Sequence, residues 1–186
     1  MIGSLLAVLA ACGGRLYKVA PLPTNAPPEI SMGNGGDLDV GAVALDGEQS
    51  YERFEANLPL AGVIAVDVRM INKSEAAIMT NSLRFELRNA SGAAFKRLAP
   101  KKALGAVMKY YGDKFYATVA YRRTLEDYES VALKQGGAIE PEREIRGIVF
   151  FQTKRETTSV DGLILSVGGL TTPVNVQLQV ARYGER

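Results

Sequence analysis

Apolar and polar positions alternate with a period of two through much of the chain after residue 41, most clearly in residues 61–71 and 82–88. Strict alternation is typical of a strand with one face toward a core and the other toward water. We expect the apolar members of these runs, with two residues of a third run at 147–152, to form the core. They are Ile64, Val66, Val68, Leu83, Phe85, Leu87, Val149 and Phe151.

Further short strands are expected along the rest of the chain. They cover residues 49–56, 93–98, 147–152, 162–167 and 174–180. Turn residues separate several of them, including Gly92 between the strands of a predicted hairpin. About seven short strands with turns between them are typical of an antiparallel sandwich. The sequence therefore predicts a mainly β domain over residues 41–186, with two sheets packed face to face.

The alternation stops in residues 100–135, where the spacing of apolar residues changes to that of a helix. One stripe has the spacing i, i+3, i+4, i+7. Its members are Leu104, Val107, Met108 and Tyr111. The spacing predicts a helix over 101–111 and makes the region a helical insertion in the β-domain.

A second helix is expected over 124–134. Thr124 and Asp127 have the spacing of a capping box, although Asp stands where Glu or Gln is usual, and Gly136 is a residue that commonly ends a helix. Residues 112–123 between the two helices fit either a strand or a continued helix, and both alternatives stay open.

The N-terminus carries a short apolar run that ends in small residues before the only cysteine of the chain. Leu9-Ala10-Ala11-Cys12 resembles the lipobox of bacterial lipoproteins. The resemblance implies that residues 1–11 are a signal peptide and that Cys12 is lipidated. Because Gly13 and not Asp follows the cysteine, it also implies an outer-membrane location facing the periplasm. The alternative is a buried N-terminal strand with a free cysteine in the core.

Residues 12–40 have the composition of a lipidated N-terminus followed by a flexible tether. Four prolines favour extended backbone, and Gly33-Asn34-Gly35-Gly36 punctuates the end of the segment. The prolines are Pro21, Pro23, Pro27 and Pro28. A spacer of this kind would hold a folded domain clear of a membrane.

Several motifs in residues 41–181 resemble the immunoglobulin-like domain of small bacterial lipoproteins of unassigned activity. Asn72-Lys73-Ser74 follows an alternating strand, and Ile139-Glu140-Pro141-Glu142 leads into Gly147-Ile148-Val149-Phe150-Phe151. In that family a Pro-Gly-Glu corner precedes a Gly-x-Val-Phe-Phe-like strand, and here Glu142 stands where the corner usually has Gly. The resemblance implies an immunoglobulin-like fold and gives little information about function.

Composition excludes several classes of chemistry. The chain has no histidine and one cysteine, which excludes Ser-His-Asp and Cys-His catalysis and a zinc site built from these ligands. A net charge of +2 is too small to favour nucleic acid as a partner. We therefore expect no enzyme activity, cofactor or metal. A carbohydrate-active enzyme that uses paired carboxylates is the weakest alternative. Its candidates are Glu126, Asp127, Glu140, Glu142 and Glu144.

The aromatic residues of the insertion are the best candidates for a binding surface, because tyrosine and arginine are enriched in interfaces. We expect a partner or ligand surface that includes Tyr110, Tyr111, Tyr116 and Arg123. In the alternative interpretation the rings seal one end of the sandwich, and Tyr111 shares the helical stripe with Leu104.

A basic run lies near the start of the insertion. It consists of Lys96, Arg97, Lys101 and Lys102. We interpret it as the end of a hairpin whose lysines discourage edge pairing, and the alternative is a surface that faces anionic lipid.

Taken together, these features predict a lipid-anchored protein of the cell envelope that acts as a non-catalytic binding or scaffolding module. Its expected partners are the membrane, through the anchor, and an envelope protein. The alternative is a carrier that holds a small apolar ligand beneath the insertion. A deep pocket would favour the carrier, and a convex aromatic surface would favour the scaffold.

Overall fold

A computed structural model describes residues 14–23, 30–153 and 159–178. The lipobox and Cys12 lie outside the described residues. The strands are β1 (Ser31–Asn34), β2 (Leu38–Ala44), β3 (Val63–Asn72), β4 (Ile78–Met79), β5 (Arg84–Arg88), β6 (Ala94–Leu98), β7 (Ala138–Ile139), β8 (Glu144–Gln152), β9 (Ile164–Gly168) and β10 (Val174–Gln177). The helices are α1 (Gly47–Phe54), α2 (Pro100–Tyr111) and α3 (Val119–Val131).

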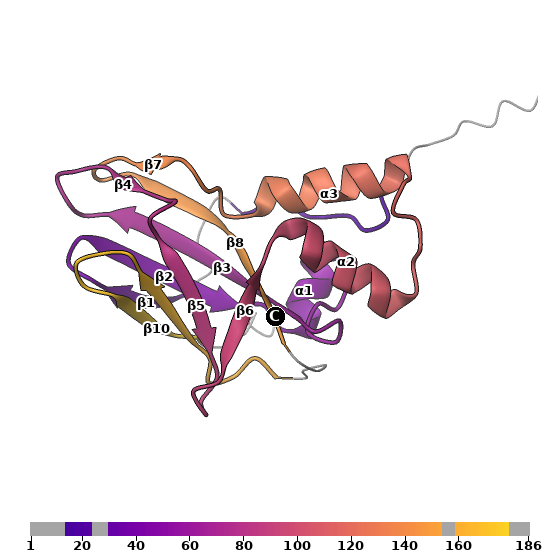
Figure 1. Cartoon of the computed structure of the whole chain (residues 1–186), viewed down its shortest axis with the longest axis horizontal. Coiled ribbons are helices and arrows are strands. Elements are labelled where there is room, and N and C mark those ends of the chain that lie inside the picture. Colours follow the sequence, from indigo (N-terminus) through magenta and orange to yellow (C-terminus); the bar gives the residue numbers. More distant parts are fainter. Residues whose placement is uncertain (1–13, 24–29, 154–158, 179–186) are drawn as a thin grey trace, which may run out of the picture.

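Eight of the strands form one antiparallel sheet in the order β1-β2-β3-β8-β6-β5-β9-β10, and β4 pairs with β7 in a small second sheet. The large sheet curls until β1 lies against β10, so it is nearly closed into a barrel (Figure 1). A Cβ atom at Gly33 would lie 2.8 Å from the carbonyl oxygen of Asn175, so this close approach of β1 to β10 needs glycine. A mainly β antiparallel fold is confirmed. A sandwich of two separate sheets is not confirmed, because β6 pairs with both β5 and β8 and joins the two halves into one sheet.

Two apolar cores lie on opposite faces of β3 and β8. The inner core fills the curled sheet and contains all eight residues that the alternation predicted to be buried. The outer core lies between the sheet and the three helices, which cover one side of the barrel (Figure 1). It includes Val63 and Ala65 of β3, Ile148 and Phe150 of β8, and Phe54 of α1. Both central strands are therefore buried on both faces.

The predicted strand at 49–56 is wrong, because this segment is helix α1. Asp46 caps the helix: its carboxylate accepts the backbone N–H of Gln49 at 2.9 Å, and the Gln49 side chain accepts the N–H of Asp46 at 3.2 Å. This reciprocal pair is a capping box, which satisfies two donors that the first turn leaves unpaired. The helix ends at Glu55, whose backbone is left-handed with φ of 49°.

The first helix of the insertion is confirmed by α2, whereas α3 differs from its predicted range. It begins five residues earlier, because the hydroxyl of Thr118 accepts the N–H of Tyr121 at 3.1 Å and so caps the helix. Thr124 is instead buried and accepts the N–H of Leu16 at 2.9 Å. The helix ends before 134 because the N–H of Leu133 turns to the carbonyl of Ile148, at 2.9 Å.

Part of the segment predicted as a tether belongs to the fold. Gly33-Asn34-Gly35-Gly36 spans the end of β1 and the turn to β2, where the Asn34 side chain accepts the N–H of Gly36 at 2.7 Å. Tyr17 is buried in the outer core, and the N–H of Ala20 donates to Arg53 of α1 at 2.7 Å. The folded part of the chain therefore begins before residue 41, because burial of Tyr17 and Leu38 holds these residues against the domain.

Candidate functional site

Helix α2 ends and α3 begins at one end of the molecule (Figure 1), and several exposed apolar side chains belong to this part of the chain. We define the tip patch as Tyr110, Tyr111, Phe115, Tyr116 and Val119, which are between 41% and 57% exposed. Large apolar side chains that remain this exposed in one short segment are typical of an interaction surface.

Sequence reasoning selected three of these five residues. Tyr110 and Tyr111 pack edge to face with ring centroids 5.0 Å apart, and Tyr116 lies 5.9 Å from the ring of Tyr121. The hydroxyl of Tyr111 accepts the N–H of Asn57 at 3.0 Å, and its ring contacts Tyr17 at 5.9 Å. Tyr111 therefore also ties α2 to neighbouring segments.

Arg123 is exposed on α3, one helical turn after Val119, so these two side chains share a face of the helix. Phe115 and Val119 were not selected from the sequence, although Tyr116 was chosen from the same segment. Their apolar character was visible in the sequence, but their exposure depends on how α2 and α3 pack.

The first described residues run beside the same helices (indigo in Figure 1). Arg15 forms an ion pair with Asp127 of α3, and the hydroxyl of Tyr17 donates to the carboxylate of Asp113. Burial, reinforced by the carboxylate of Asp113, raises the pKa of Tyr17 above its usual value. The chain thus enters the domain along α3 and close to the tip patch.

A buried ion pair holds the next part of this segment on the outer face of the sheet. The guanidinium of Arg146 donates twice to the carboxylate of Asp67, at 2.9 and 2.7 Å, and once to the carbonyl of Pro23 at 2.5 Å. The side chains of Asp67 and Arg146 are 1% and 10% exposed. The two opposite charges compensate each other through a bidentate pair. The pair is therefore a structural feature of the outer face of the sheet.

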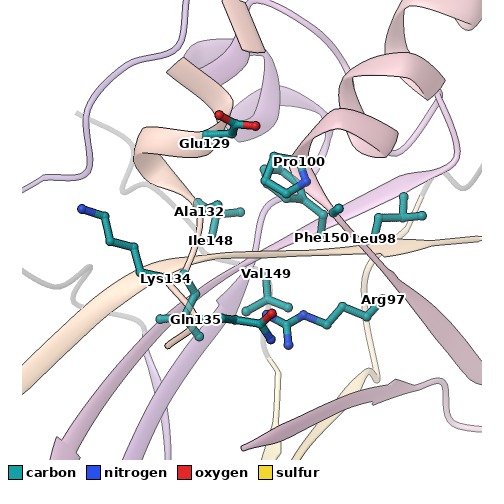
Figure 2. A pocket seen from close by; sticks show the side chains of 12 residues that line it. Arg97, Leu98, Pro100, Glu129, Ala132, Lys134, Gln135, Ile148, Val149 and Phe150 are labelled. Atoms are coloured by element: carbon teal, nitrogen blue, oxygen red, sulfur yellow. The ribbon is translucent and has the colours of Figure 1, made fainter. Parts of the chain in front are cut away.

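A cavity of about 410 Å³ lies beside α3, where β6 leaves β8 to lead into α2 (Figure 2). The pairing of β6 with β8 reaches from Lys96 to Leu98, and the segment after α3 bridges to Ile148 instead. A Cβ atom at Gly147 would lie 2.4 Å from Cα of Leu133, so glycine permits this close approach. Twelve residues line the cavity, of which eight are apolar and four are polar: Arg97, Glu129, Lys134 and Gln135.

The carboxylates considered for catalysis lie mainly in ion pairs. Asp127 pairs with Arg15, Glu142 with Lys73 and Glu144 with Arg69. In the described part of the chain, no group of three or more acidic or cysteine side chains could hold a metal ion. None of the helices described is long and apolar enough to cross a membrane.

Comparison with known proteins gives one structural similarity. No family model matches the chain, and no curated protein matches its sequence. A crystal structure of the yjhA protein from Bacillus subtilis is similar over 73% of this chain and 75% of that chain, with 11% sequence identity and a TM-score of 0.40.

Proposed function

We propose that this chain is a lipid-anchored protein of the bacterial cell envelope that acts as a non-catalytic binding or scaffolding module, on the outer membrane and facing the periplasm. The observation that carries the proposal is the tip patch. Its side chains combine apolar area with tyrosine hydroxyls. Such side chains suit an interface, where the ring packs against a partner and the hydroxyl remains hydrated. Arg123 adds a residue type that is common at the energetic centres of interfaces.

The path of the N-terminal segment supports the anchor and the patch acting together. Cys12 is three residues before Arg15, which pairs with α3. Three residues of extended chain span at most about 10 Å. A lipid on Cys12 would therefore keep α3 and the tip patch close to the membrane surface, where an envelope protein partner would meet them.

The immunoglobulin-like resemblance is kept as part of the proposal, and one contact between its motif residues supports it. The N–H of Glu142 donates to the carbonyl of Asn72 at 2.9 Å, so two of the quoted motifs meet. Glu142 has φ of 57°, a left-handed conformation that favours glycine, and glycine is the residue that the family usually has at this corner.

A second candidate function is a carrier of a small, largely apolar ligand. The cavity beside α3 favours it, because its volume lies in the range of ligand sites, about 300–1,000 Å³, and eight of its twelve lining residues are apolar. The cavity lies against the helical insertion, and the alternative drawn from the sequence was a ligand held beneath that insertion.

Replacing Cys12 by serine tests the anchor. Cys12→Ser should abolish incorporation of labelled palmitate, because serine lacks the thiol of the lipobox cysteine. The protein should then move from the membrane to the soluble fraction. Gly13→Asp is the control: it keeps the cysteine, so acylation should persist while the protein shifts toward the inner membrane. Unchanged membrane fractionation of Cys12→Ser would refute lipidation.

Replacing Tyr116 and Arg123 together by alanine tests the tip patch. A photo-crosslinking residue at position 116 in intact cells identifies the partner by mass spectrometry. The double variant should then weaken binding of that partner by tenfold or more, on the order expected for interface centres. Thermal stability should change by less than about 0.5 kcal/mol, because both side chains are exposed.

The matched control for the tip patch is Tyr51→Ala with Arg84→Ala, an exposed tyrosine on α1 and an exposed arginine on β5. This control should leave partner binding unchanged. If the Tyr116 and Arg123 variant instead melts several degrees earlier and still binds the partner normally, the rings have a packing role and the patch is not the docking surface.

A further inference from the structure

Arg97 points toward the inside of the curled sheet rather than to the outer surface. In the pairing of β6 with β8 it lies directly opposite Phe151, a residue of the inner core. Residues opposite each other in an antiparallel pair share a face. The members of the basic run therefore have different environments. Lys96 is exposed, whereas Arg97 is half-buried and lines the cavity.

The charge of Arg97 is not neutralised within the described part of the chain. None of the ion pairs there includes it. Its guanidinium lies over the ring of Phe85, 5.0 Å from the centroid, which is a cation–π contact and supplies no hydrogen-bond acceptor. Burial without a nearby carboxylate lowers the pKa of Arg97, although an arginine stays protonated at neutral pH.

The other charged side chains of the cavity are directed elsewhere. Figure 2 shows Arg97 reaching across from β6 toward Gln135 and Val149, while Glu129 and the ammonium group of Lys134 lie at the far rim. One cation and a neighbouring amide thus meet at one side of the space. Val149, Phe150 and Leu98 supply apolar wall beside them.

We propose that this cavity binds a small amphiphilic anion, of the class of medium-chain carboxylates, with its carboxylate on Arg97 and its apolar body along the wall. A guanidinium matches a carboxylate with two parallel hydrogen bonds. A single cation fits a monoanion better than a polyanion. A wholly apolar occupant would remove water from Arg97 and give it no acceptor, which disfavours binding. This inference rests on the second candidate function, the carrier, and specifies its ligand.

Calorimetric titration with matched probes tests the ligand class. The full chain carrying Cys12→Ser, so that no acyl group competes, is titrated with straight-chain carboxylates of six to twelve carbons and with alcohols of the same lengths. We expect one carboxylate per chain to bind, at least tenfold tighter than the matching alcohol. Equal binding of acids and alcohols would overturn the proposed ligand class and leave the carrier standing. Binding of neither series would overturn both.

Substitution of Arg97 tests the position of the anion. Arg97→Met keeps an apolar stem over Phe85 and should weaken carboxylate binding roughly ten- to a hundredfold, the range for loss of charged hydrogen bonds. It should leave alcohol binding unchanged. Arg97→Lys keeps the charge and should recover part of the loss. Arg84→Met, which removes an exposed arginine from the neighbouring strand β5, is the control and should bind as the parent does. Parent-like binding by a folded Arg97→Met protein would overturn the proposal.

Discussion

Asp67→Ala is expected to lower the free energy of unfolding by about 3–5 kcal/mol, the range for removing one partner of a buried ion pair. The variant leaves Arg146, whose side chain is 10% exposed, without its carboxylate in the outer core. The hydrogen bond to the carbonyl of Pro23 does not neutralise the guanidinium, because a carbonyl carries no net charge. Denaturant unfolding followed by circular dichroism measures the change.

Two controls test whether the loss of stability comes from leaving a buried charge unpaired. Glu144→Ala breaks the neighbouring pair with Arg69, whose side chains are 42% and 30% exposed, and should cost less than about 1 kcal/mol. The double replacement Asp67→Leu with Arg146→Met should recover most of the lost stability, because it leaves no buried charge unpaired. Equal costs for Asp67→Ala and Glu144→Ala would show that the outer face is not covered as described.

Phe150→Ala is expected to cost about 3–5 kcal/mol, the range for truncating a fully buried phenylalanine. Phe150 is 1% exposed, and its ring lies 5.8 Å from that of Phe54 in α1 and 5.7 Å from that of Tyr128 in α3. The substitution removes the aromatic centre of the contact between the helices and the sheet. The unfolding midpoint in denaturant reports the loss.

The control for Phe150→Ala is Phe115→Ala in the tip patch, where the ring is 57% exposed. Its removal should change stability by less than about 0.5 kcal/mol. A small effect of Phe150→Ala would mean that the helices do not pack on β8, and the outer core would then be wrong.

The local sequence pattern was enough to identify those elements whose buried residues repeat with a single period. Alternation identified the inner face of β3, β5 and β8, and the apolar stripe identified α2. It failed at α1, where Asp46 and Gln49 already had the spacing of a capping box but were not used. It also failed at β1 and β2, where glycines that permit close approach looked like a linker.

The candidate sites depended more on tertiary structure. The sequence supplied the residue types of the tip patch, whereas their exposure, and the structural role of Tyr111, follow from how α2, α3 and the N-terminal segment pack. The sequence offered a ligand site beneath the insertion as an alternative, but neither the lining of the cavity nor the inward direction of Arg97 was predicted. Arg97 belongs to a basic run in the sequence, and only its register opposite Phe151 places it inside the curled sheet.

The sequence by itself determined that the chain is mainly β, which positions face the inner core, and that an aromatic helical insertion interrupts the strands. These features arise from residues a few positions apart, whose spacing fixes which side chains share a face. Tertiary structure alone decided that the strands curl into one nearly closed sheet, that helices bury Phe150 on its outer face, that the ion pair of Asp67 is buried on the same face, and that a cavity opens beside Arg97. Those outcomes depend on contacts between residues far apart in the chain, and local periodicity carries no information about which distant segment covers a face.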